Sequence, residues 1–111
     1  MEIVFAARKL QKLCSEKKKM VKELGAECAA KLQQRLSEMA AVETLEDLRT
    51  LPGARCHELT ADRQGQLAAD LKYPQRLIFV PDHDPLPVKP DGGLDWREVK
   101  RVRIVEIVDY H

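Results

Sequence analysis

The stretch Arg101–Asp109, which reads Arg-Val-Arg-Ile-Val-Glu-Ile-Val-Asp, decides the fold of this chain. Only Arg103 and Glu106 interrupt a run of β-branched apolar residues, which is typical of a central strand covered on both faces. Tyr110 and His111 follow directly and close the sequence. A phenol and an imidazole are therefore expected beside a well-buried strand, and both groups can move protons once their pKa values are tuned.

Three shorter β-like runs lie upstream of this strand and are joined by tight turns. They cover Arg55–Leu59, Gln66–Leu71 and Gln75–Val80. The segment Asp62–Gly65 has the composition of a hairpin loop with glycine in the left-handed conformation, and Tyr73-Pro74 forms a second turn. The three runs are therefore predicted to form an antiparallel meander.

The first half of the chain is helical in composition after a short strand at residues 1–6. The apolar spacing that follows predicts either one long helix or two pieces that meet near Ser15. Gly25 is a plausible stop, and Ala26–Ala41 is the clearest helix. Its apolar stripe consists of Leu32, Leu36 and Met39, whereas Lys31, Gln34, Arg35 and Glu38 are expected mostly off that stripe.

Two capping signals flank the meander. Thr44 is spaced as a cap for a short helical turn with Asp47, and Asp95 is followed by Glu98 at the same spacing. Between them, residues 81–93 hold four of the six prolines and predict an irregular excursion. Helices and strands that are segregated along the chain bury their apolar faces by packing a helix layer on a sheet. This order of elements therefore predicts an α+β fold in one domain, residues 1–111. An N-terminal strand and two main helices pack on a mostly antiparallel sheet of about four to five strands.

Composition limits the function classes. The 111 residues include 19 basic and 18 acidic ones, a net charge of +1, so a nucleic-acid contact would have to use a local patch. Three cysteines without a Cys-x-x-Cys pair are expected to be reduced and to act mainly as small buried hydrophobes. No signal peptide or membrane span is recognisable, so a cytoplasmic protein without membrane contact is expected.

A metal site is not predicted, although histidines and carboxylates are present. The available ligands lack any His-x-x-x-His or cysteine-pair spacing. Gly92-Gly93 is not followed by the Lys-Ser/Thr of a phosphate-binding loop. The lysine run Lys17–Lys19 is typical of a solvated helix face, with contact to RNA or a partner as the alternative. The candidate ligands are His57, Asp82, His83, Asp84 and His111.

Basic and imidazole groups of the β half form the remaining constellation. His57 and Arg76 fall on two predicted strands, and Arg63 lies in the hairpin loop. A purely structural role in the sheet would explain each of these residues by itself. Arg76, for instance, could bury its aliphatic stem and expose its guanidinium group. Together with the Tyr110-His111 ending, the group is also compatible with a catalytic cluster.

Three segments of the chain resemble the killer toxins of bacterial toxin–antitoxin systems. They are Leu51–Leu59 (LPGARCHEL), Asp62–Gln66 (DRQGQ) and Tyr73–Phe79 (YPQRLIF), and the closing Asp109-Tyr110-His111 fits the same pattern. The chain is similar in particular to the HigB-type branch of the RelE/ParE superfamily, also called plasmid maintenance killer proteins. The resemblance covers the order of elements over essentially the whole chain, and the specific motifs cover residues 51–79 and the last nine residues.

The resemblance implies a metal-independent endoribonuclease, an mRNA interferase, that cleaves ribosome-bound mRNA by acid–base catalysis and needs no cofactor. It implies a helix-turn-helix antitoxin (HigA-like) as partner, with the ribosome and mRNA as further partners and a dimer within the toxin–antitoxin complex. Carried over by position, the catalytic residues are His57, Arg76, Tyr110 and His111. Arg63 takes the basic hairpin position.

One departure from the family pattern concerns the turn before Asp62. The family commonly has a lysine and a glycine there, whereas this chain has Thr60-Ala61. Arg63 and Lys72 are the candidates to replace that cation at the RNA phosphate. Two alternatives stay open: a ParE-type DNA gyrase inhibitor, which resembles this fold without the acid–base set, and a degenerate, non-catalytic toxin that acts as an antitoxin-binding module.

Overall fold

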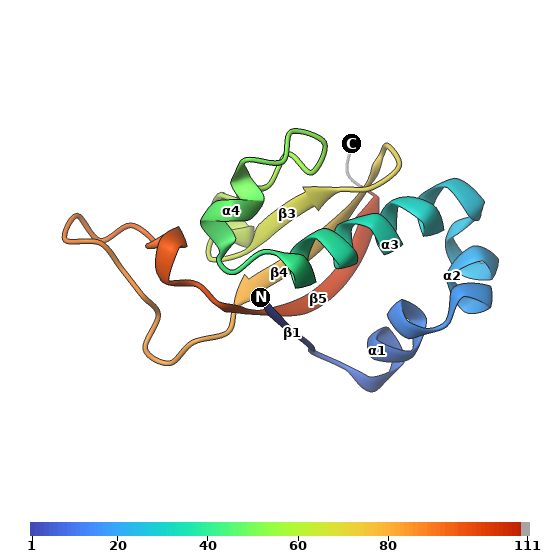
Figure 1. Cartoon of the computed structure of the whole chain (residues 1–111), viewed down its shortest axis with the longest axis horizontal. Helices are drawn as coiled ribbons and strands as arrows, with labels where there is room; N and C mark the ends of the chain where they lie inside the picture. Colours follow the sequence, from blue (N-terminus) through green and yellow to red (C-terminus); the bar gives the residue numbers. More distant parts are fainter. Residues whose placement is uncertain (110–111) are drawn as a thin grey trace.

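Four helices pack on one face of a five-stranded mixed sheet in the computed structural model, which describes residues 1–109 (Figure 1). The predicted α+β class, with a strand at the N-terminus, is confirmed. The excursion around residues 82–95 projects at the end of the molecule opposite α1 and α2 (Figure 1). The helices are α1 (Arg8–Ser15), α2 (Lys17–Leu24), α3 (Ala26–Ala41) and α4 (Leu45–Arg49), with two 3-10 turns, η1 (Ala61–Arg63) and η2 (Trp96–Glu98).

The sheet has the strand order β1-β5-β4-β3-β2. The meander β2-β3-β4 is antiparallel as predicted, β4 pairs antiparallel with β5, and β1 pairs with β5 in parallel. The last strand therefore lies between two neighbours, as its apolar sequence predicts. The bounds are β1 (Glu2–Phe5), β2 (His57–Glu58), β3 (Leu67–Asp70), β4 (Gln75–Pro81) and β5 (Arg101–Asp109).

The helical half follows its local signals closely. The first helical region is two pieces, because α1 ends at Ser15 and Glu16 is extended between α1 and α2. Gly25 ends α2 with a φ of 85°, a conformation that glycine adopts without strain. The predicted Thr44 signal forms a capping box with Asp47 at the start of α4. The Asp95 capping signal predicts a helical turn over Trp96–Lys100, and the turn that forms, η2, ends at Glu98; Asp95 accepts a hydrogen bond from the Arg97 amide there.

The expectation that β5 is covered on both faces is wrong. Val102 and Ile104 are buried toward the helices, but every residue from Val105 to Val108 is partly exposed. The physical reason is that the helices contribute only to the core on one face, while none of the described helix residues packs on the other. The strand also carries a β-bulge: Ile78 pairs with Glu106 and Phe79 with Ile104, so Val105 is an extra residue on β5. A bulge shifts the alternation of side chains by one, which moves Ile107 to the helix side and Val108 to the other face.

Arg35 is the largest departure from the helix prediction. The sequence places it mostly off the apolar stripe of α3, yet it is 2% exposed, while Leu36 on the predicted stripe is only partly buried. Its Nε donates to the Asp70 carbonyl oxygen at 2.7 Å and its Nη2 to the Gly53 carbonyl oxygen at 2.6 Å. A buried guanidinium thus ties α3 to the end of β3 and to the loop before β2.

Two properties of the described residues bear on the class of protein. Over residues 1–109, no helix is both long and apolar enough to span a membrane. In the same range, no group of three or more His, Cys, Asp or Glu residues is placed to hold a metal ion. His83, one of the ligand candidates, instead accepts a hydrogen bond at Nε2 from the Lys100 amide at 3.0 Å.

Candidate functional site

The face of the sheet opposite the helices carries His57, and the strand pairing explains why. His57 lies opposite Ala68, Ala68 lies opposite Ile78, and Ile78 lies opposite Glu106. Residues that oppose each other across neighbouring strands point to the same face of a sheet. Ala68 and Ile78 belong to the small apolar cluster on the helix-free side. His57 and Glu106 therefore lie in one row across this face, which we call the open face.

Arg76 lies in the next row of the open face. It is opposite Asp70 on β3 and Val108 on β5. Its Nε is 3.5 Å from Asp70 Oδ1, and Arg55 Nη1 is 3.4 Å from Asp70 Oδ2. Asp70 thus lies between two guanidinium groups, and it orients Arg76 across the face. The side chain of Arg76 is 24% exposed, so its charge is accessible from solvent.

Arg63 reaches the open face from the hairpin loop. Its Nη1 donates to Glu106 Oε1 at 2.6 Å and to Gln66 Oε1 at 2.9 Å. The loop ends at Gly65, with a φ of 93°, as the sequence predicts. The short ion pair with Glu106 fixes the guanidinium over β5 and offsets its charge. His57, Arg63 and Arg76 are therefore brought to one face of the sheet.

The imidazole of His57 is held by its own loop. Its Nδ1 lies 2.8 Å from the carbonyl oxygen of Arg55. A carbonyl oxygen can only accept a hydrogen bond, so Nδ1 carries the proton of this bond and Nε2 is the acceptor in the neutral ring. Arg55 itself has a positive φ of 46°. This arrangement suits His57 to take a proton at Nε2.

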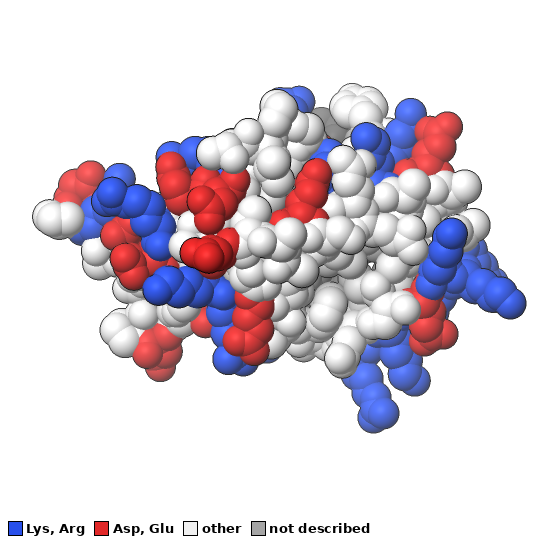
Figure 2. All heavy atoms as spheres, viewed as in Figure 1, with Lys and Arg blue, Asp and Glu red and all other residues white. Residues whose placement is uncertain are grey.

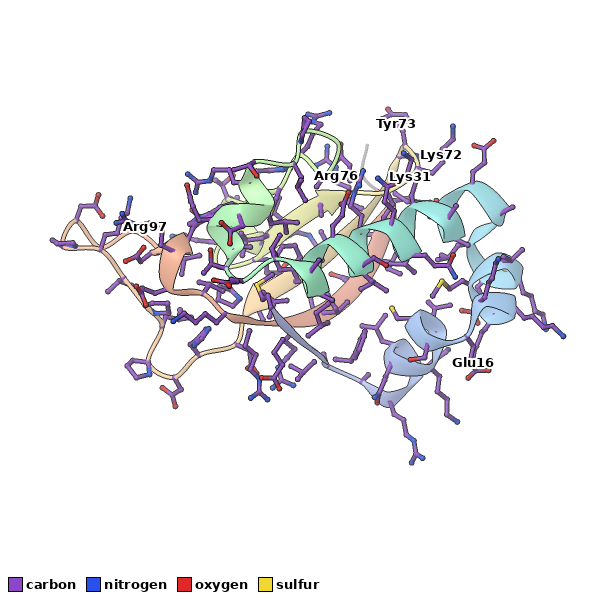
Figure 3. The ribbon with its side chains drawn as sticks, viewed as in Figure 1. Glu16, Lys31, Lys72, Tyr73, Arg76 and Arg97 are labelled. Atoms are coloured by element: carbon purple, nitrogen blue, oxygen red, sulfur yellow. The ribbon has the colours of Figure 1, made fainter. Side chains whose placement is uncertain are left out.

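Lys72 does not join this group. It lies in the turn between β3 and β4, and its Nζ is 3.0 Å from Glu27 Oε2 on α3. Figure 3 shows Lys72 beside Lys31 of α3 and Tyr73 at the tip of the hairpin. Lys72 therefore faces the helix layer, and the structure does not bring it together with His57 and Arg63.

Thr60 and Ala61, the two residues before Asp62, lie at the start of η1. Ala61 has a φ of 57°, a left-handed conformation that glycine takes without strain and that costs alanine free energy. Thr60 is exposed and brings no charge to the loop.

The proposed roles of Tyr110 and His111 lie outside the described residues. Asp109, which precedes them in the chain, is the last residue of β5 and lies opposite Gln75. Gln75 is adjacent in sequence to Arg76. The described structure therefore tests neither residue, and their roles stay predictions.

Sequence reasoning missed the two carboxylates of the open face. Asp70 and Glu106 pair with Arg76 and Arg63, respectively. The first pair had a signal: a turn centred on Tyr73-Pro74 sets positions 70 and 76 opposite each other. The sequence held no corresponding signal for Glu106, because its place on the open face depends on the bulge in β5.

The cysteine thiols are poor candidates for a nucleophile. Burial raises the pKa of Cys14 to about 11, and it raises the pKa of Cys28 as well. Burial also raises the pKa of Cys56 to about 12, with Arg49 acting in the opposite direction. Because the thiolate is the reactive form, burial disfavours a nucleophilic role for these thiols.

Comparison with known proteins gives a structural likeness and no sequence match. No protein-family model matches the chain, and no curated protein matches it significantly. Similar solved structures include a YoeB/ParE toxin from Agrobacterium tumefaciens, with a TM-score of 0.52 and 9% sequence identity over 100% of both chains. At so low a sequence identity, the likeness shows a shared fold and does not show a shared function. The chain therefore shares its α+β fold with this YoeB/ParE toxin, and it carries His57, Arg63 and Arg76 on the open face of its sheet.

Proposed function

We propose that this protein is the toxin of a type II toxin–antitoxin system and acts as a metal-independent endoribonuclease on ribosome-bound mRNA. The observation that carries the proposal is the placement of an imidazole and two guanidinium groups on one open sheet face. The shared fold with a YoeB/ParE toxin supports the toxin class. The motifs at residues 51–79 favour the HigB-type branch.

The chemistry needs two proton transfers and a cation. The ribose 2′-oxygen attacks the adjacent phosphorus, and as that bond forms the bond from phosphorus to the 5′-oxygen breaks. A base takes the 2′-hydroxyl proton and an acid protonates the departing 5′-oxygen, leaving a 2′,3′-cyclic phosphate. His57 and His111 form the acid–base pair, and Nε2 of His57 suits the base role.

The arginines neutralise the charge that develops on the phosphate. Arg76 and Arg63 bind its oxygens, bidentately where the geometry allows. Asp70 and Glu106 hold the two guanidinium groups over the face before RNA arrives. Tyr110 orients His111 or stacks on a base of the RNA. The partners of this activity are the ribosome, its mRNA and a helix-turn-helix antitoxin of the HigA type.

Inducible expression in bacteria tests the activity directly. We expect growth arrest together with new mRNA 5′ ends, mapped against uninduced cells. The His111→Ala variant is expected to remove both effects, because it deletes one member of the acid–base pair. Arrest without new mRNA ends would contradict the ribonuclease proposal and favour a gyrase-type target. Absence of arrest would also contradict it.

A specific observation favours the degenerate module as second candidate. Both arginines of the open face pair with a carboxylate, and Thr60 stands where the family has a lysine. Glu106 Oε1 lies 2.6 Å from Nη1 of Arg63, a candidate phosphate ligand. If Glu106 offsets the charge of Arg63, the open face binds RNA less strongly than its arginines alone would.

Glu106→Gln is expected to raise affinity for a short single-stranded RNA by about 5-fold, because it removes a negative charge beside Arg63. In a plot of log affinity against log salt concentration, the slope should become steeper by about one unit, which corresponds to one additional phosphate contact. Fluorescence anisotropy across a salt series measures both. The matched control is Glu43→Gln, which removes the same charge at an exposed site between α3 and α4. Equal effects of the two variants would contradict a role for Glu106.

A further inference from the structure

Arg55 brings a third guanidinium group to the open face. Its Nη1 is 3.4 Å from Asp70 Oδ2, and the other oxygen of that carboxylate, Oδ1, is 3.5 Å from Nε of Arg76. The side chain of Arg55 is 70% exposed, against 24% for Arg76 and 22% for Asp70. One carboxylate serves two guanidinium groups, so the three side chains together keep an excess of positive charge toward solvent.

Two backbone contacts hold Arg55 in a defined place beside the proposed base. The Asp70 amide donates to the carbonyl oxygen of Ala54 at 2.8 Å, which ties the segment before β2 to the end of β3. The carbonyl oxygen of Arg55 itself lies 2.8 Å from Nδ1 of His57. The same residue therefore orients the imidazole through its backbone and places a guanidinium group next to it.

The residue type at position 55 is not explained by backbone geometry or by stability. Arg55 has a φ of 46°, in the left-handed region that glycine adopts without strain and that costs other residues free energy. Its ion pair with Asp70 is largely exposed on the arginine side, and such pairs contribute little to stability. Strained backbone that the surrounding structure holds in place is concentrated at functional sites. We therefore looked for a role of the guanidinium group in binding.

The position of Asp70 decides which phosphate Arg55 can bind. Arg76 lies opposite Val108, so it is on the β5 side of Asp70, whereas Arg55 contacts Asp70 from the β2 side. A phosphate placed between the two arginines would meet the negative charge of Asp70. Each guanidinium group is therefore suited to a phosphate of its own, and successive phosphates of one RNA strand provide this arrangement.

We propose that Arg55 binds the RNA phosphate next to the one that is cleaved. The inference rests on the proposed function and names a further substrate-binding residue for it. Arg76 and Arg63 bind the reacting phosphate, while Arg55 holds its neighbour through a charge-assisted contact. The neighbouring phosphate does not change its charge during the reaction, so this contact is as strong in the ground state as in the transition state. It therefore lowers KM and leaves kcat unchanged.

Arg55→Ala in the full chain should raise KM for cleavage of mRNA on programmed ribosomes by about 10-fold and change kcat by less than about 2-fold. Binding is measured separately with a ten-nucleotide 2′-O-methyl RNA, which lacks the attacking hydroxyl and is not cleaved. Its affinity, from fluorescence anisotropy, should fall by about 10-fold, and the slope against log salt should become shallower by about one unit. Arg55→Lys keeps the charge and should stay within about 3-fold of the unchanged protein.

Arg55→Gly separates a role in binding from a role in the fold. Glycine keeps the carbonyl oxygen that His57 contacts, and it adopts the left-handed backbone without strain. The midpoint of thermal unfolding should therefore rise by about 3 °C, while RNA affinity falls as far as in Arg55→Ala. A purely structural arginine would give the opposite pair of results, a lower midpoint and an unchanged affinity.

Two controls remove a positive charge elsewhere. Arg97→Ala is the matched one, because Arg97 is 75% exposed and lies 3.6 Å from Asp95, much as Arg55 does from Asp70, and Figure 3 shows it well apart from Arg76. Residues 8–24 hold seven lysines and arginines against two glutamates, and Figure 2 shows such basic side chains gathered over α1 and α2. Lys18→Ala, at an exposed site of α2, tests this second basic region. Both variants should change RNA affinity by less than about 2-fold.

Three results would overturn the inference. The first is an unchanged affinity and KM in Arg55→Ala, and the second is an equal loss of affinity in Arg97→Ala or Lys18→Ala, which would mean that any surface cation serves. The third is a fall in kcat at constant KM, which would assign Arg55 to the reacting phosphate instead. Failure of the proposed function is distinguishable, because it requires that the unchanged protein itself does not cleave mRNA, whereas cleavage by Arg55→Ala with a normal KM contradicts this inference alone.

Discussion

Replacing Arg35 by alanine should lower the free energy of unfolding by about 3–5 kcal/mol. The guanidinium is almost fully buried and donates to two carbonyl oxygens, of Asp70 and Gly53, and at 2.9 Å to Glu38 Oε1. Alanine would leave these acceptors without their donor in a closed space, and each unsatisfied buried group costs about 1–3 kcal/mol. Chemical denaturation followed by circular dichroism measures the loss.

The matched control is Gln34→Ala, one position earlier on α3. Gln34 is part of the exposed face of the helix and bonds Glu38 Oε2 at 3.2 Å, so its loss should change stability by less than about 0.5 kcal/mol. Arg35→Lys keeps the charge but loses the planar fork, and most of the destabilisation should remain. If Arg35→Ala unfolds at the same denaturant concentration as Gln34→Ala, the buried bonds contribute nothing to stability.

Arg35 also matters for the site, because it links the helix layer to the strands of the open face. Asp70, whose carbonyl it binds, carries the carboxylate that orients Arg76. Gly53, its other carbonyl partner, begins the segment that leads to His57. A loosened Arg35 contact would thus displace both sides of the site at once. Activity measurements on Arg35 variants therefore report on positioning.

His57→Gln should lower the rate of mRNA cleavage by about 10²–10⁴-fold, the usual effect of removing one proton-transfer group. Glutamine retains a hydrogen-bond donor for the Arg55 carbonyl but cannot exchange protons near neutral pH. The side chain is only partly buried, so we expect the free energy of unfolding to change by less than about 1 kcal/mol. Primer extension on programmed ribosomes, with purified variants at equal concentration, measures the rate.

The control for this variant is His83→Gln, the same substitution in the excursion after β4. His83 accepts a hydrogen bond from the Lys100 amide and takes no part in the open face. Its replacement should cost about 1 kcal/mol of stability and leave the cleavage rate unchanged. Equal rates for the two variants would show that the imidazole at position 57 is not needed. The acid–base assignment to His57 would then be wrong.

Local signals in the sequence were enough for most element bounds. Glycine at position 25 and the Thr44–Asp47 capping box end and start helices through interactions within a few residues. The helix Ala26–Ala41 has the bounds that its pattern predicts. The two turns of the meander, at Gly65 and Tyr73-Pro74, likewise lie where their composition indicates. Each of these features depends on interactions between residues that are close in the chain, so the local sequence is enough to predict it.

Pairing partners depended on contacts far apart in the chain. From the sequence, either the edge of the meander or the last strand could pair with the first strand, and the structure pairs it in parallel with β5. Strand β2 is only two residues long, against five expected, because its pairing with β3 covers only His57 and Glu58. The single domain, the HigB-type branch and the roles of the site residues stay predictions.

The sequence by itself determined the fold class, the helix and turn positions and the types of reactive side chain. Only the tertiary structure decided that Arg35 is buried, and that Asp70 and Glu106 pair with the arginines of the open face. It also decided that the pairing of β5 with β1 ends at Ile104. The physical reason is range: caps and turns form within a few residues, whereas burial of a charge and the register of a bulged strand depend on partners brought together by the whole fold.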